Sequence, residues 1–154
     1  MKISTRSHYA VRALFHMAYH SPNTPMKVAQ VSEAEAISAS FLDQIFQSLR
    51  KAGIVQSKRG PRGGFVLARP PRDITLKHII CAVEGASAQG ICRETPTEDT
   101  QRPTSGIDVG AQVWQDVAAR IDAIMNRVTL EELVLRGERM GLHRPSAQHF
   151  TYVI

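Results

Sequence analysis

Residues 54–68 read Ile54-Val55-Gln56-Ser57-Lys58-Arg59-Gly60-Pro61-Arg62-Gly63-Gly64-Phe65-Val66-Leu67-Ala68. Two short runs in this stretch, residues 54–57 and 65–68, have the composition of β-strands. Three glycines and a proline stand between the runs, and these residues are typical of turns. The stretch therefore predicts an antiparallel hairpin with a long basic tip.

Positive charge is concentrated around this hairpin. Between Gln44 and Arg72 the sequence has seven cations and no acid. The cations are Arg50, Lys51, Lys58, Arg59, Arg62, Arg69 and Arg72. The whole chain carries a net charge of +5, so the remainder, with 12 cations against 14 acids, carries −2. A cationic block this local is typical of a face that binds a polyanion, and the alternative is an ordinary solvated charged face.

Three helical segments precede the hairpin. We expect helices over residues 5–19, 26–34 and 40–52, with Ser40 as the cap of the third and Gly53 as its end. The apolar residues of the third helix repeat every three or four positions and are Leu42, Ile45, Phe46 and Leu49. Three short helices followed by a basic hairpin is the order of a winged helix-turn-helix. We therefore expect a mostly α fold with a small β-hairpin.

A short helix, a long irregular connection and a long helix follow the hairpin. Thr75 is expected to cap a helix that runs to Glu84, and residues 85–110 form a loop too long for an ordinary connection. Five apolar residues of the long helix are spaced 3, 4, 3 and 4 apart, as in a coiled coil. They are Trp114, Val117, Ile121, Ile124 and Val128. Thr129 is expected to cap one more helix, which Gly137 ends.

The composition narrows the class of protein. No apolar run approaches the roughly 18 residues needed to cross a bilayer, and no secretory signal is evident at the N-terminus. Two cysteines are too few for a disulfide framework, so we expect a cytoplasmic protein. The pI of 9.6 favours nucleic acid over membrane as the acidic partner. No catalytic motif is present. His16 and His20 lie one helical turn apart, but no third ligand is evident and surface histidines are the preferred interpretation.

Several motifs together carry a family resemblance. They are Tyr9-Ala10-Val11-Arg12-Ala13-Leu14, Phe41-Leu42-Asp43-Gln44-Ile45-Phe46, Leu49-Arg50-Lys51-Ala52-Gly53-Ile54-Val55, Arg59-Gly60-Pro61-Arg62-Gly63-Gly64-Phe65, Leu67-Ala68-Arg69-Pro70-Pro71, Ile74-Thr75-Leu76 and Val83-Glu84-Gly85. The sequence resembles the Rrf-two family of bacterial transcription regulators over residues 1–85, and in pattern over residues 113–133. The resemblance implies a dimeric winged-helix regulator, which we expect to act as a repressor.

Members of this family often hold an iron–sulfur cluster through three cysteines in the loop before the dimer helix. This chain departs from the family there, because Cys92 is the only cysteine of its loop. The resemblance therefore leaves Cys92 and His8 as candidate ligands of a metal or cluster, since mixed Cys/His clusters exist. The alternative is a cluster-free regulator that responds to a small metabolite or a protein partner. Cys92 is also the candidate for redox sensing, whereas Cys81 is expected to be a buried, inert thiol.

The third helix and the hairpin are expected to contact double-stranded DNA. Ser38, Ser40 and Gln44 stand where recognition helices meet base edges in the major groove. Gln47, Arg50 and Lys51 are better placed for phosphates. The hairpin contributes four further residues, Lys58, Arg59, Arg62 and Gly63, of which the two arginines are expected in the minor groove. Simple solvent exposure is the alternative for Gln44 and Gln47, and non-specific nucleoid binding is the alternative for the protein.

The apolar stripe of the long helix needs a partner. A homodimer is favoured, because two winged helices related by a two-fold axis read a pseudo-palindromic operator, and packing on the chain's own domain is the alternative. We thus expect a DNA-binding domain over residues 1–73, a short helix and sensor-like loop over 74–109, and a dimerisation helix with its capping helix over 110–137. A C-terminal tail covers residues 138–154.

Overall fold

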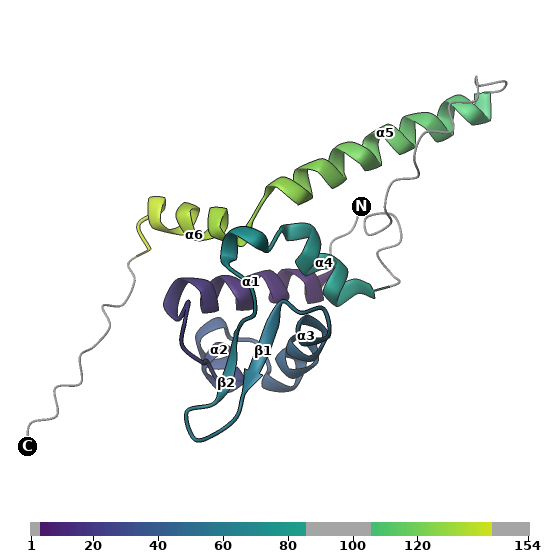
Figure 1. Cartoon of the computed structure of the whole chain (residues 1–154). Helices are drawn as coiled ribbons and strands as arrows, with labels where there is room; N and C mark the ends of the chain where they lie inside the picture. The colour runs from purple at the N-terminus through teal and green to yellow at the C-terminus, as the bar shows by residue number, and fades with distance from the viewer. Residues whose placement is uncertain (1–3, 86–105, 143–154) are drawn as a thin grey trace, which may run out of the picture.

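The computed structural model describes residues 4–85 and 106–142, with the side chains of the helix that begins at Gly106 described from residue 109 onward. Helices α1 (Thr5–His20), α2 (Val28–Glu35) and α3 (Ala39–Lys51) precede strands β1 (Val55–Lys58) and β2 (Gly64–Leu67). A short 3-10 helix η1 (Pro71–Asp73) leads to α4 (Leu76–Glu84), α5 (Gly106–Arg127) and α6 (Leu130–Arg139). The expected mostly helical fold with one small hairpin is confirmed (Figure 1). Cys92 and most of the tail lie outside the described residues.

Helix α1 is the centre of the fold. Helices α2, α3 and the hairpin lie on one side of it, and α4 and α6 lie on the other (Figure 1). Ser4 caps the helix, since its Oγ accepts a hydrogen bond from the Ser7 backbone N–H at 3.2 Å. Ala10 and Ala13 are fully buried, and their small side chains let neighbouring helices approach the α1 backbone closely.

The turn between α2 and α3 differs from the sequence expectation at one point. Ser38, not Ser40, caps α3, because the Ser38 Oγ accepts a hydrogen bond from the Phe41 backbone N–H at 3.3 Å. Ser40 therefore lies inside the first turn. Ala36 has a positive φ of 52°, and this left-handed residue ends α2 and turns the chain toward α3. The expected apolar face of α3, including Ile45 and Leu49, is buried as predicted.

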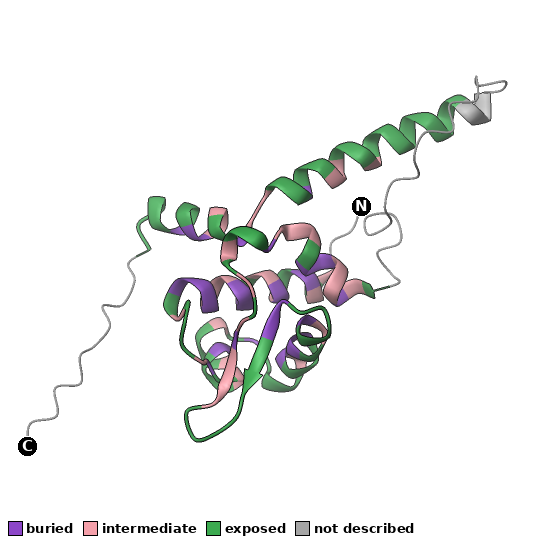
Figure 2. Ribbon diagram, viewed as in Figure 1, coloured by how far each residue is buried: buried purple, intermediate pink, exposed green. Residues whose placement is uncertain are grey.

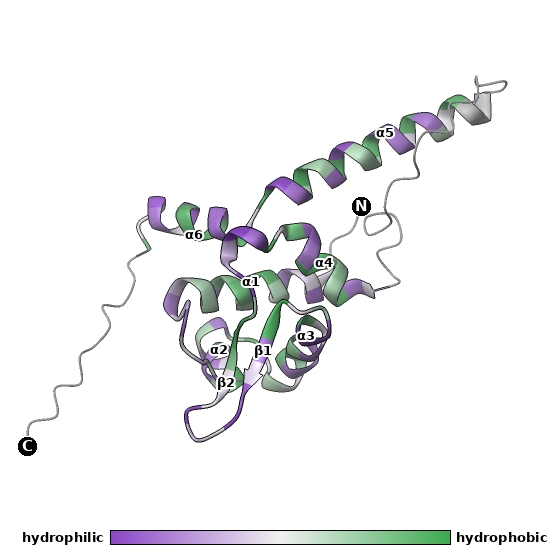
Figure 3. Cartoon of the chain, in the orientation of Figure 1, coloured by the Kyte–Doolittle hydropathy of each residue, from purple (hydrophilic) through white to green (hydrophobic). Residues whose placement is uncertain are grey.

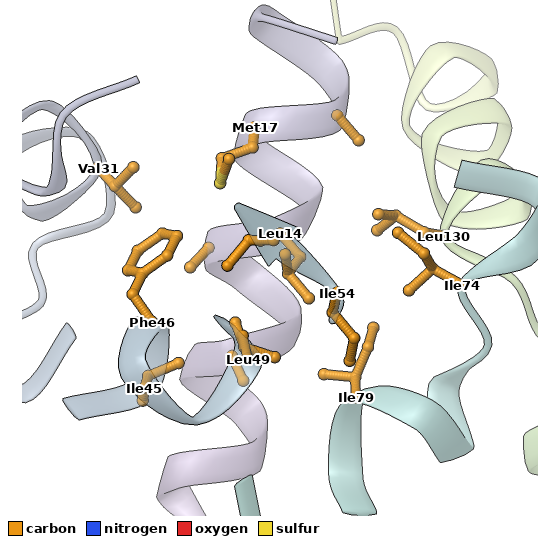
Figure 4. Close-up of a cluster of buried hydrophobic side chains, with 14 of the residues drawn as sticks. Leu14, Met17, Val31, Ile45, Phe46, Leu49, Ile54, Ile74, Ile79 and Leu130 are labelled. Atoms are coloured by element: carbon orange, nitrogen blue, oxygen red, sulfur yellow. The ribbon is translucent and has the colours of Figure 1, made fainter. Parts of the chain in front are cut away.

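The core joins side chains from both halves of the described chain. Its fully buried members include Leu14 and Phe46 on the hairpin side and Ile74, Ile79 and Leu130 on the α4–α6 side (Figure 4). Helix α5 contributes little to this core along its length (Figure 2). Met125 is its one described residue below a tenth exposed, at 4%, and sequence periodicity did not single it out.

Helices α4, α5 and α6 meet at a short strand-like junction. The Leu76 N–H donates to the Val128 carbonyl and the Leu130 N–H donates to the Ile74 carbonyl, both at 2.8 Å. Lys77 of α4 adds an ion pair with Asp122 of α5, with Nζ and Oδ1 2.5 Å apart. These contacts fix the start of α4 against the end of α5.

The structure differs from the sequence expectation at the start of α5 and at the end of α6. Helix α5 begins at Gly106, so the irregular connection ends earlier than residue 110. Gly137 does not end α6, which continues to Arg139. This glycine is buried against α1, and a Cβ on it would lie 2.8 Å from the Phe15 ring. Close helix packing, not helix termination, therefore explains the residue. No helix within the described ranges is long and apolar enough to cross a membrane.

Candidate nucleic-acid interface

The outer face of α3 is polar and exposed. Burial of its apolar stripe turns the opposite side of the helix to solvent, and Ser38, Ser40, Gln44 and Gln47 are all exposed there. The Oγ atoms of Ser38 and Ser40 are 3.3 Å apart, so the helix cap and the first turn form one polar cluster. The structure therefore places the candidate base-reading residues together at the N-terminal half of one helix.

The cations of the third helix and the hairpin are also exposed. Arg50 and Lys51 stand in the last turn of α3, and Lys58, Arg59 and Arg62 follow along the hairpin. None of these five forms an ion pair within the part of the chain that the structure describes. Unpaired exposed cations keep their charge available to phosphate groups. Arg69 differs, because it is only half-exposed and its Nε is buried.

The hairpin is a regular antiparallel pair that needs two glycines. Its register pairs Val55 with Leu67 and Lys58 with Gly64. A Cβ on Gly63 would lie 2.4 Å from the Lys58 carbonyl oxygen, so only glycine allows this tip. Gly63 is half-buried within the tip, and its backbone shapes the loop that presents Arg59 and Arg62.

Backbone hydrogen bonds tie strand β2, near the hairpin tip, to the segment just before α2. The Met26 N–H donates to the Phe65 carbonyl at 2.9 Å, and the Phe65 N–H donates to the Met26 carbonyl at 2.8 Å. Gly64 permits this approach, since a Cβ there would lie 2.4 Å from the Met26 oxygen. In addition, the Phe65 ring stacks on Phe46 of α3. The basic hairpin and the third helix are thus held as one surface.

Helix α5 carries an apolar face that its own domain does not cover. Trp114 is 73% exposed and Ile124 is 62% exposed, and Val117 is exposed as well. Ile121 and Val128, the other two members of the expected stripe, are half-buried. Val109 and Val113 are exposed as well, and they precede Val117 at intervals of four residues, which the spacing of 3 and 4 from Trp114 did not include. Along the helix, apolar and polar residues alternate (Figure 3).

The candidate metal ligands are not assembled into a site in the described chain. His8 is exposed on α1, and Cys92 lies outside the described residues. His16 Nδ1 is 3.1 Å from Glu35 Oε1, and the His16 and His20 rings are 4.4 Å apart. Burial, and then the neighbouring His16, lower the pKa of His20. Within residues 4–85 and 106–142, no group of three or more His, Cys, Asp or Glu is arranged to hold a metal.

Cys81 corrects the sequence expectation. It was expected to be a buried, inert thiol, but it is half-buried and disulfide-bonded. The expectation was wrong because Cys81 lies on the edge of the apolar face of α4, whereas Ile79, Ile80 and Val83 occupy the buried side.

Comparison with known proteins decides the family. The sequence profile of the Rrf2 family, described as iron-dependent transcriptional regulators, matches residues 3–136. The chain belongs to the Rrf2 family. The chain is 37% identical to the transcriptional regulator IscR of Vibrio atlanticus over 138 residues, which cover 90% of this chain and 78% of the relative.

Solved structures of other Rrf2 proteins have the same fold. T. potens IscR superposes with a TM-score of 0.73 at 32% identity, covering 94% of this chain and 93% of that chain. CymR, the global cysteine regulator of B. subtilis, gives a TM-score of 0.70 at 26% identity, covering 88% and 98% of the two chains. As an Rrf2 member, the protein is a DNA-binding transcription regulator and not an enzyme.

The residues of this chain do not fit the all-cysteine ligand set of an iron–sulfur cluster. The chain contains two cysteines, and the sulfur of Cys81 is already in a disulfide. A cluster bound by three thiolates therefore lacks its ligands in this Rrf2 protein.

Proposed function

We propose that this Rrf2 protein is a homodimeric repressor that binds a pseudo-palindromic operator. Helix α3 enters the major groove with Ser38, Ser40 and Gln44 toward base edges, while Gln47, Arg50 and Lys51 contact phosphates. Lys58, Arg59, Arg62 and Gly63 at the hairpin tip contact the adjacent minor groove and its backbone. One observation carries the proposal. Helix α3 and the hairpin are packed together and carry five exposed cations, none of which forms an ion pair within the described residues.

The uncovered face of α5 supports the dimer. Trp114, Val117 and Ile124 stand on one side of a helix whose apolar residues repeat with coiled-coil spacing. A row of large exposed apolar side chains on a polar helix is a common mark of a protein–protein interface. A second copy of the same helix supplies a partner with the same pattern, and two-fold symmetry gives two half-sites.

Gel-shift titration tests the DNA-binding surface. The probe is promoter DNA recovered from a genome-wide binding map of the native protein. Arg59→Ala and Arg62→Ala should each weaken binding, whereas Arg139→Ala should not. Arg139 is a matched control, because it is an exposed arginine on α6, on the opposite side of α1 from the hairpin (Figure 1). Unchanged affinity in both hairpin variants would exclude the wing, which is the hairpin of β1 and β2, from the interface.

We propose that the signal is read without an iron–sulfur cluster, through thiols. The disulfide at Cys81 supports this proposal, because disulfides in bacterial cytosolic proteins are usually transient and redox-sensing. In the proposed step, the thiols of Cys81 and Cys92 give up two protons and two electrons to a peroxide. The product is a disulfide, and hydrogen peroxide is reduced to two water molecules. Control by a small metabolite or a protein partner is the alternative.

Anaerobic purification separates these possibilities. Iron and sulfide are measured in the native protein and in Cys92→Ala, and operator affinity is measured before and after peroxide treatment. Thiol sensing predicts an iron-free protein whose affinity responds to peroxide, and Cys92→Ala and Cys81→Ala should both lose this response. Stoichiometric iron and sulfide would contradict the cluster-free proposal. Indifference to peroxide would leave the metabolite or protein partner as the signal.

A further inference from the structure

Glu84, at the end of α4, accepts hydrogen bonds from the beginning of α1. The Ser7 Oγ donates to Glu84 Oε1 at 2.6 Å, and the Ser4 Oγ donates to the same oxygen. Ser7 is 1% exposed and is the buried polar residue of the described core. The Ser4 and Ser7 hydrogen bonds lower the pKa of Glu84, and the charge of Arg6 lowers it further. The carboxylate is therefore ionised at neutral pH and lies in the field of Arg6.

Arg6 connects the same end of α1 to α3. Its Nη2 donates to the Ser48 Oγ at 2.9 Å, across 42 positions of sequence. Its Nε is buried and has no hydrogen-bond partner within the described residues. A buried donor without a partner is costly, so the guanidinium must be held in place by its other interactions. Within the described chain, the Ser48 hydroxyl is the printed partner of this guanidinium, and the first turn of α1 that carries Arg6 is itself held by the Ser4 and Ser7 hydrogen bonds to Glu84.

Ser48 lies on the helix that carries the candidate base-reading residues. It is half-buried, and the exposed Gln44 and Gln47 stand within one turn of it. Helix α3 also packs against α4. A hydrogen bond from α1 to Ser48 therefore restrains the rotation of α3 about its axis, and a small rotation of a recognition helix displaces the side chains that meet the bases.

We propose that Arg6 is a positioning residue for α3, and that Glu84, through its hydrogen bonds with Ser4 and Ser7, fixes the first turn of α1 from which Arg6 extends. Through these two residues, a displacement of the end of α4 alters the presentation of α3 to DNA. This inference rests on the proposed role of α3 in operator binding.

A double-mutant cycle on operator binding tests the coupling. Ser48→Ala, Arg6→Met and Glu84→Gln are measured singly and in pairs, on operator and on non-operator DNA of equal length. Each single variant should weaken operator binding by about three- to tenfold, the size of one ordinary intramolecular hydrogen bond. Non-operator binding should change little. The Arg6→Met, Ser48→Ala double variant should bind no more weakly than Arg6→Met alone, because both changes remove one interaction.

Amide hydrogen exchange of the free protein gives a second, DNA-independent measurement. Glu84→Gln should speed exchange in α3, and it should leave α2 unchanged as an internal control. Multiplicative losses in the double variant, equal losses on both DNAs, or unchanged exchange in α3 would each overturn the inference. A native protein with no preference for operator DNA would instead refute the proposed function, while the exchange measurement would still decide the coupling.

Discussion

Phe65 of β2 stacks on Phe46 of α3, with ring centroids 4.8 Å apart and an interplanar angle of 24°. Phe46 is 1% exposed and belongs to the core, so the hairpin is attached to the centre of the fold through its partner ring. Since Phe65 also exchanges two backbone hydrogen bonds with Met26, the residue holds the hairpin from both sides. A rigid wing beside α3 is what simultaneous contact with two grooves requires.

Phe65→Leu should weaken both the fold and operator binding. Loss of the ring pair should lower the free energy of unfolding by about 0.5–1.5 kcal/mol. Operator affinity should fall as well, because the wing is no longer held against α3. Phe15→Leu is the control, since Phe15 stacks on Tyr19 at a centroid distance of 5.4 Å on α1, in the same geometry but away from the wing. Equal operator affinity in the two variants would contradict the role of Phe65.

Gly64→Ala should be strongly destabilising. The added Cβ would collide with the Met26 carbonyl, and the φ of +153° is itself unfavourable for alanine. We expect a loss of about 1–3 kcal/mol or more in the free energy of unfolding, measured by urea denaturation. Gly110→Ala is the matched substitution, because it lies exposed in α5 with no atom within 4 Å of its Cβ. It should be neutral or stabilise by up to about 1 kcal/mol.

Operator binding should depend steeply on salt. Each phosphate contact contributes a slope of roughly −0.9 in log affinity against log salt concentration. Lys58→Ala removes one contact from each subunit of the proposed homodimer, so it should make the slope shallower by about twice that amount, and it should weaken operator and non-operator DNA alike. Titrations at four or five salt concentrations measure this directly. A nearly flat response of the native protein would contradict an interface built on exposed cations.

Ile124→Asp should separate the dimer. Ile124 is more than half exposed in the single chain, so the substitution should leave the monomer folded while placing a charge in the proposed interface. Analytical ultracentrifugation should show a monomer, and operator affinity should fall sharply. Gln115→Asp adds the same charge to the exposed opposite side of α5 and should remain dimeric. Sedimentation of Ile124→Asp as an intact dimer would refute this assembly. Ile121→Asp is a less clean probe, because Ile121 is half-buried in the single chain.

Glu84→Gln should change how the free energy of unfolding depends on pH in the acid range. The pKa of Glu84 is lowered by Ser4, Ser7 and Arg6, so the unfolded chain takes up its proton at a higher pH than the folded chain does. The free energy of unfolding of the native protein should exceed that of Glu84→Gln by a constant amount between about pH 7 and about pH 5. This difference should shrink as the pH falls below the ordinary glutamate pKa of about 4.3 and through the lower folded value. Urea unfolding across this range measures it, and a difference that does not vary with pH would count against the carboxylate's role.

Local sequence signals predicted the helices and the hairpin well. Periodic apolar residues gave the buried face of α3, and glycines marked the hairpin tip. The errors occurred where two signals competed or tertiary packing intervened. Ser38 and Ser40 are both competent caps, and Gly137 resembles a helix end although it is placed by the Phe15 ring.

Contacts distant in sequence had no local signal. Glu84 meets Ser7 across 77 positions, and Arg6 meets Ser48 across 42. No periodicity or spacing marks such pairs, because they depend on how α1, α3 and α4 pack. The surface residues of α3 and the hairpin were easier to identify, since exposure follows directly from the position of the buried stripe.

Selection of DNA from a random duplex pool tests the central claim most directly. The native protein is used for several rounds at physiological salt, and the enriched sequences are compared with those selected by Arg62→Ala. The native protein should enrich a two-fold symmetric sequence with half-sites about one helical turn apart, and Arg62→Ala should enrich it less. Binding without enrichment of any sequence would contradict specific recognition by α3 and the wing.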